Sequence, residues 1–121
     1  MASYIKINDV TYPAVVNTKF EDRNWDYREV KIIHLEMPAQ QAAELFVDGI
    51  NWYEVNIETD MRPFVNENGE TVYETYQNEV LTSNADFCFA GEIVDHRDGT
   101  ITVKMGKHTP AELLNMLEEV L

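Results

Sequence analysis

Hydrophobic and polar positions alternate along much of the chain, and turn residues separate the alternating segments. Residues 4–7 and 10–16 flank Asn8-Asp9, a dipeptide that tolerates the positive φ angles of a tight hairpin turn. A two-residue loop at this point sets Ile5 against Tyr12 and gathers the apolar side chains of both segments on one face. Turn and pattern agree, so they predict an opening β-hairpin.

The longest alternating segment runs from Trp52 to Leu81 and turns at Asn68-Gly69, the strongest short hairpin signal in the chain. A two-residue loop at Asn68-Gly69 places the apolar side chains of both strands on one face, with pairs such as Val65 with Val72 and Met61 with Tyr76. Strands of this length can reach about 40 Å, and Pro63 marks the first of them as an edge strand. The pattern is compatible with a hairpin that projects from the domain and with one that lies flat across its core.

A third hairpin is predicted between residues 87 and 107, where Arg97-Asp98-Gly99 supplies a three-residue loop with a left-handed glycine. This loop sets Ile93 against Val103, whereas a two-residue loop would set Ile93 against Lys104. We prefer the three-residue loop because it gathers six apolar side chains on one face: Phe87, Phe89, Ile93, Ile101, Val103 and Met105.

Two segments have helical spacing. Residues 38–48 begin with Pro38, carry Ala42, Leu45 and Phe46 on one face, and stop at Gly49. Residues 110–121 follow an N-cap threonine, a first-turn proline and the glutamate of a capping box, in the order Thr109-Pro110-Ala111-Glu112. Their apolar residues recur at helical spacing, and we expect that face to cover the sheet: Leu113, Leu114, Leu117, Val120 and Leu121.

These elements predict one α+β domain over residues 1–121. Antiparallel hairpins form a mostly antiparallel sheet or a small barrel, with one short helix at about 38–48 and a C-terminal helix at about 110–121. Hydrophobic residues make up 45% of the 121 residues, which is enough to form a core without disulfides or metals.

The charge balance narrows the choice of partners. Nine Lys and Arg residues against 22 Asp and Glu residues give a formal net charge of −13, which disfavours direct binding to nucleic acid or to anionic membranes. Cys88 is the only cysteine, which excludes an internal disulfide and fits a reducing compartment. No secretory signal and no long apolar segment are visible, so we expect the protein in the cytoplasm of the producing cell.

The sequence lacks the common motifs for phosphate binding, metal binding and nucleophilic catalysis. The sequence has no glycine-rich phosphate loop and no Cys-x-x-Cys pair, and its three histidines, His34, His96 and His108, are far apart. It also lacks a nucleophile elbow. The sequence therefore predicts no cofactor, no metal site and no enzymatic activity.

Two groups of residues are candidates for protein contacts. Large aromatic residues stand among charges in the loop at 21–28, where Trp25 either packs over the sheet edge or anchors an interface. Near the tip of the long hairpin, Phe64 and Tyr73 are predicted to pair on the otherwise polar face. The predicted partner-binding residues are Trp25, Tyr27, Arg28, Phe64, Asn68, Gly69 and Tyr73.

The opening hairpin, Ile5-Lys-Ile-Asn-Asp-Val-Thr-Tyr-Pro13, resembles a feature of small virion and tail-module proteins of bacteriophages and prophages in Gram-positive hosts. The acidic α+β build and the long central hairpin are also similar to such proteins. The resemblance implies a structural or assembly role with protein partners, among them further copies of the chain, and a location in the virion. It supplies no catalytic residues.

Two other functions are compatible with the sequence. The net charge of −13 suits an acidic inhibitor that imitates nucleic acid and occupies a DNA-binding protein. A pocket between helix and sheet would suit a module that binds a small molecule.

Overall fold

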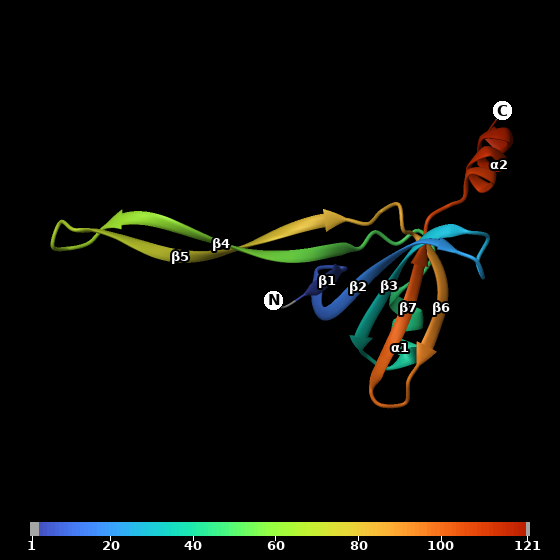
Figure 1. Ribbon diagram of the computed structural model, residues 1–121, viewed down its shortest axis with the longest axis horizontal. Coiled ribbons are helices and arrows are strands. Elements are labelled where there is room, and N and C mark those ends of the chain that lie inside the picture. Colours follow the sequence, from blue (N-terminus) through green and yellow to red (C-terminus); the bar gives the residue numbers. More distant parts are fainter. Residues whose placement is uncertain (1–2, 121) are drawn as a thin grey trace.

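The computed structural model describes residues 3–120, which contain seven antiparallel strands and two helices (Figure 1). In chain order they are β1 (Tyr4–Ile7), β2 (Val10–Asp22), β3 (Arg28–Glu36), α1 (Ala39–Leu45), β4 (Tyr53–Val65), β5 (Thr71–Ser83), β6 (Phe89–Asp95), β7 (Thr100–Gly106) and α2 (Pro110–Val120). The strands form one sheet in the order β5-β4-β1-β2-β3-β7-β6. The predicted α+β class with a mostly antiparallel sheet is confirmed.

The core lies where α1 packs on one face of the sheet. Trp52, fully buried, joins this core, and its indole N–H donates a hydrogen bond of 2.9 Å to the carbonyl oxygen of Phe87. The helix contributes Ala42 and Phe46 to the same cluster. The remaining buried members come from the strands and connections: Ile5, Ile7, Ala14, Ile33, Leu35, Met37, Phe87, Ile101, Val103 and Met105.

Two of the three predicted hairpins have the expected pairing. Ile5 faces Tyr12 across the Asn8-Asp9 turn, whose two residues have φ angles of 51° and 65°. Ile93 faces Val103 in the β6–β7 hairpin. The prediction for Phe89 is wrong, because a bulge between Ala90 and Ile93 shifts the register and turns Phe89 to the face opposite the core.

The predicted register of the long hairpin is wrong by one residue. Val65 pairs with Thr71 rather than Val72, and Met61 pairs with Thr75 rather than Tyr76. The physical reason lies in the turn, because Asn66 closes a three-residue loop instead of the two-residue loop at Asn68-Gly69. The Asn66 N–H donates to the Glu70 carbonyl oxygen at 2.9 Å, and the Asn66 Oδ1 accepts the backbone N–H groups of Asn68 and Glu70.

The long hairpin projects from the rest of the molecule (Figure 1). Residues Tyr53–Val55 at the base of β4 pair with β1, and the remainder of β4 and the whole of β5 pair only with each other among the described residues. We call the projecting part, residues 56–80, the arm, and the rest of the described chain the body.

The helix α1 is shorter than expected, and α2 is placed differently from the expectation. The first helix ends at Leu45, and the N–H of Phe46 bonds to the Ala42 carbonyl oxygen at its end. The second begins at Pro110 as predicted, but it stands away from the sheet (Figure 1). The expectation that its apolar face covers the sheet is wrong, since Leu113, Leu114 and Leu117 are exposed. Leu121 and the side chain of Val120 lie outside the described part of the chain.

Candidate functional site

The loop between β2 and β3 folds back onto the body through Trp25 and Arg28. The Arg28 guanidinium lies 4.4 Å from the centre of the Trp25 ring and 4.9 Å from that of Phe89, and the two rings meet edge to face at 5.8 Å. Arg28 is only 3% exposed. Its Nε also donates to the Trp25 carbonyl oxygen at 3.2 Å, so this loop is held by one cation between two aromatic rings.

Two glycines make room for Trp25. A Cβ atom on Gly91 would lie 2.7 Å from the Trp25 ring, and one on Gly106 would lie 2.7 Å from Arg28 Cδ and 2.9 Å from Trp25. The sequence reasoning assigned the glycines chiefly to turns, which holds for Gly49, Gly69 and Gly99 with their positive φ angles. A glycine inside a strand often marks the close approach of another group, and that signal at Gly91 and Gly106 was missed.

Arg28 also fixes the first turn of α2. Its guanidinium donates to both carboxylate oxygens of Glu112 at 2.9 and 3.0 Å and to the Lys107 carbonyl oxygen at 2.9 Å. Glu112 in turn accepts the backbone N–H of Thr109, and the Thr109 hydroxyl accepts that of Glu112, which is the predicted capping box. The Arg28 hydrogen bonds, with the Thr109 N–H, lower the pKa of Glu112 from 4.5 to about 2.

A second buried charge ties the same loop to β7. Asp22 is fully buried, and its Oδ2 lies 2.6 Å from Lys104 Nζ. The hydrogen bond from Lys104 lowers the pKa of Asp22, and the same contact raises the pKa of Lys104. The loop is therefore anchored at both ends.

The structure separates the three loop residues that were predicted to bind a partner. Trp25 and Arg28 face into the molecule, whereas Tyr27 is 64% exposed and has a φ angle of 56°. A bulky residue with positive φ is uncommon outside tight turns. Tyr27 is the member of this group that stays free to meet a partner.

The arm presents both of its faces to solvent. Because Phe64 pairs with Val72 and Tyr73 pairs with Pro63, Phe64 and Tyr73 lie on opposite faces, and the prediction that they share one is wrong. Tyr73 and Val65 are about two-thirds exposed, at 64% and 67%. The predicted tip residues Asn68 and Gly69 form the loop at the far end of the arm.

The apolar side of α2 is a further exposed surface, and the sequence reasoning did not single it out for partner binding. Leu117 is 62% exposed, and three neighbours on the helix are about half exposed: Leu113, Leu114 and Met116. The helix contacts the body through its N-terminal turn at Glu112. An apolar helical stripe without a covering element is typical of a surface that packs on another protein.

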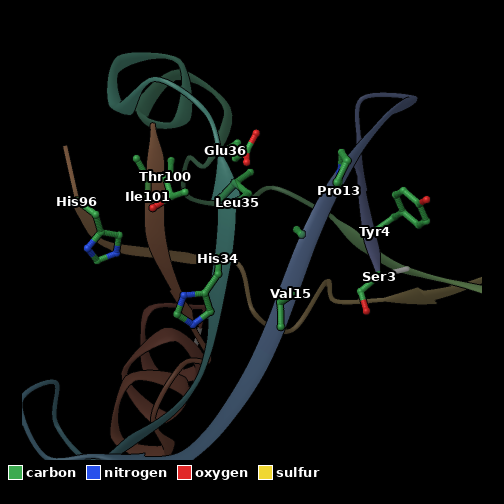
Figure 2. Close-up of a pocket in the computed structure, with 11 residues that line it drawn as sticks. Ser3, Tyr4, Pro13, Val15, His34, Leu35, Glu36, His96, Thr100 and Ile101 are labelled. Atoms are coloured by element: carbon green, nitrogen blue, oxygen red, sulfur yellow. The ribbon is translucent and has the colours of Figure 1, made fainter. Parts of the chain in front are cut away.

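An open groove of about 640 Å³ runs across the sheet between β1 and β7 (Figure 2). Its lining includes Pro13 and Val15 of β2, His34 of β3, and His96. The Thr102 hydroxyl lies 2.7 Å from His96 Nε2 and 3.4 Å from His34 Nδ1, so the two imidazoles are linked to Thr102. The groove is lined by no α1 residue and thus differs from the helix–sheet pocket considered for a small molecule.

Within residues 3–120, no group of three or more His, Cys, Asp or Glu side chains is arranged to hold a metal ion. Neither helix of that part is long and apolar enough to cross a membrane. Comparison with protein-family models, curated proteins and solved structures found no match to the chain.

Proposed function

We propose that this protein is a structural or assembly component that acts by contacts with other protein subunits, as the resemblance to phage virion and tail-module proteins implies. The observation that carries the proposal is the arm, a two-stranded ribbon that stands clear of the body (Figure 1). A two-stranded hairpin alone is at best marginally stable in water. The arm therefore gains most of its stability from a partner.

The composition of the arm supports this function. Exposed apolar side chains lie along it on both strands: Met61, Phe64, Val65, Tyr73, Tyr76 and Val80. Large apolar and aromatic side chains are those that carry the binding energy of protein interfaces. The exposed Leu residues of α2 and the exposed Tyr27 supply additional contact surface at the other end of the molecule.

Nucleic-acid mimicry ranks behind this proposal. Within residues 3–120, seven of the described carboxylates lie within ion-pair distance of a basic side chain, so they are less available as phosphate substitutes: Asp22, Asp26, Glu29, Glu54, Asp60, Glu92 and Glu112.

Size-exclusion chromatography with multi-angle light scattering, over a concentration series at two salt concentrations, tests the proposal. We expect a defined oligomer that persists in high salt. In a shortened variant, an Asn-Gly turn replaces residues 57–79 and joins Asn56 to Val80, which already face each other. This variant should retain the near-ultraviolet circular dichroism signal of Trp52. Its oligomer should fall apart, so that light scattering gives a mass lower than the shorter chain alone explains. A wild-type protein that is monomeric at every concentration would contradict assembly by this chain.

A further inference from the structure

The two outer edges of the sheet differ in how well they are protected against pairing. β6 forms one edge, and it is seven residues long with a bulge between Ala90 and Ile93. β5 forms the other edge, and it is 13 residues long with an unbroken register against β4. Short strands and bulges are common protections of an edge strand, and β5 has neither.

The sequence of β5 has few of the other protections, since two of its 13 residues are charged, Glu74 and Glu79. Its residues, TVYETYQNEVLTS, include no lysine, no proline and no glycine. The free edge of β4, on the opposite side of the arm, carries both Arg62 and Pro63. An edge strand of this length without such residues is a template for pairing with another strand.

The hydrogen-bond pattern shows which groups β5 offers. Asn66 and Glu70 are bonded to each other through their backbones at the turn. Because bonded pairs alternate along an antiparallel ladder, even-numbered residues of β5 bond to β4 and odd-numbered residues turn their N–H and C=O groups to the outer edge. Pro63 fits this pattern, since it sits at an odd position of β4, where its missing N–H would face outward.

We propose that the outer edge of β5 pairs with β5 of a second copy of this chain, antiparallel and about a two-fold axis at Gln77. This inference rests on the proposed assembly function. The two arms then form one four-stranded sheet in the order β4-β5-β5-β4. The axis at Gln77 is the one that pairs all 13 residues of β5, and it also brings outward-facing odd residues opposite one another.

The side chains are complementary in this register. Tyr73 of each copy faces Leu81 of the other, and each is already beside an apolar residue of β4, Pro63 and Val55 respectively. A row of four apolar side chains therefore crosses the sheet twice: Val55, Leu81, then Tyr73 and Pro63 of the second copy. Three or more strands with an apolar face are what an isolated ribbon lacks for independent stability.

The two glutamates of β5, Glu74 and Glu79, are compatible with this register. Glu74 of each copy faces Val80 of the other, and Glu79 faces Thr75, so no carboxylate is directly opposite a carboxylate. The arm as a whole still carries six acidic residues and one arginine. Repulsion between the arms is longer in range than the pairing, so added salt should tighten the dimer.

A matched pair of proline variants tests the inference on the full chain. Gln77→Pro removes an outward N–H of β5 at the centre of the proposed contact. Thr59→Pro is the control: Thr59 faces Gln77 across the arm, so this variant removes an outward N–H from the β4 edge instead. We expect Gln77→Pro to raise the dimer dissociation constant at least tenfold by light scattering, and Thr59→Pro to change it less than twofold. Raising the salt concentration should lower the wild-type constant.

Disulfide trapping at the same two positions tests the register. In a Cys88→Ala background, Gln77→Cys places two thiols across the two-fold axis, at the spacing of about 5.5 Å between Cα atoms of a bonded pair. Thr59→Cys places its thiols three strand spacings apart, about 14 Å. We expect rapid oxidation to a linked dimer for Gln77→Cys and little for Thr59→Cys.

The outcomes separate the two proposals. An oligomer that is unaffected by Gln77→Pro, or that links no faster through position 77 than through position 59, overturns the pairing of β5 and leaves assembly by another surface intact. A wild-type chain that is monomeric at all concentrations and both salt levels contradicts both.

Discussion

The β6–β7 hairpin and the arm are both antiparallel hairpins closed by three-residue loops with a left-handed glycine, Gly99 and Gly69. The first is covered on one face by the core with α1, and on the other face, near Gly91 and Gly106, by Trp25 with Arg28. The second is covered on neither. The same local structure is thus packed against other elements in the body and exposed in the arm, which is why we propose the arm as the interaction surface.

The largest expected difference comes from removing one aromatic side chain from each region. Trp52→Ala empties a fully buried site and removes the hydrogen bond to the Phe87 carbonyl oxygen. We expect it to lower the free energy of unfolding by about 3–5 kcal/mol. Tyr73→Ala, on the exposed arm, should change it by less than about 0.5 kcal/mol.

Urea unfolding followed by circular dichroism measures both values, at a concentration below that of self-association. Equal losses of stability in the two variants would mean that the arm is packed as tightly as the body. That result would contradict the difference between the two regions.

Glycines give a sharper test, because one glycine in each region is replaced by the same residue. Gly91→Ala pushes a Cβ to within 2.7 Å of the Trp25 ring and 3.0 Å of the Lys104 carbonyl oxygen. We expect a loss of about 1–3 kcal/mol from this overpacking. Gly69→Ala has open space around it and costs about 1 kcal/mol through its positive φ angle.

Amide hydrogen exchange distinguishes the two effects by place. Gly91→Ala should speed exchange in the β2–β3 loop and in β6, and Gly69→Ala should speed it in the arm alone. Faster exchange in the arm of Gly91→Ala would show that the two regions open together.

The parts of the fold that the sequence predicted well are those in which burial selects one register. The pairs Ile5 with Tyr12 and Ile93 with Val103 each have a buried member, Ile5 and Val103, so turn chemistry and burial agree and a one-residue slip is costly. In the arm neither face is buried, burial cannot select the register, and the Asn66 side chain decides it. The same reasoning explains the error at α2, whose capping box fixes where the helix begins but not what it packs against.

The candidate surfaces were predicted in part for a similar reason. The exposed positions of Tyr27, Phe64 and Tyr73 follow from local patterns. The positions of Trp25 and Arg28 depend on residues far along the chain, Gly91, Gly106 and Glu112, and no local signal connects them.

Acidification should release α2 while the body stays folded. The pKa of Glu112 is about 2 in the folded protein, against 4.5 for an ordinary glutamate, because Arg28 and the Thr109 N–H bond to its charged form. A lowered carboxyl pKa contributes stability that is complete above about pH 4.5 and is lost as the pH falls towards 2. Glu112→Gln should remove the anchor at neutral pH, at a cost of about 1–2 kcal/mol.

The indole N–H resonance of Trp25 reports this change, since Trp25 lies against Arg28. We expect it to shift below pH 4 in the wild type and to have its shifted position at pH 7 in Glu112→Gln. A titration midpoint at the value of an ordinary glutamate would contradict the lowered pKa.

The smallest effect is expected on the exposed helix α2. Leu117→Glu in α2 should change the stability of the monomer by no more than about 0.5 kcal/mol, because the side chain is 62% exposed and loses no buried contact. If Leu117→Glu instead destabilised the monomer by several kcal/mol, α2 would pack on its own body in solution. If it left the monomer unchanged and reduced the mass of the oligomer, the apolar face of α2 would be a second contact beside the arm.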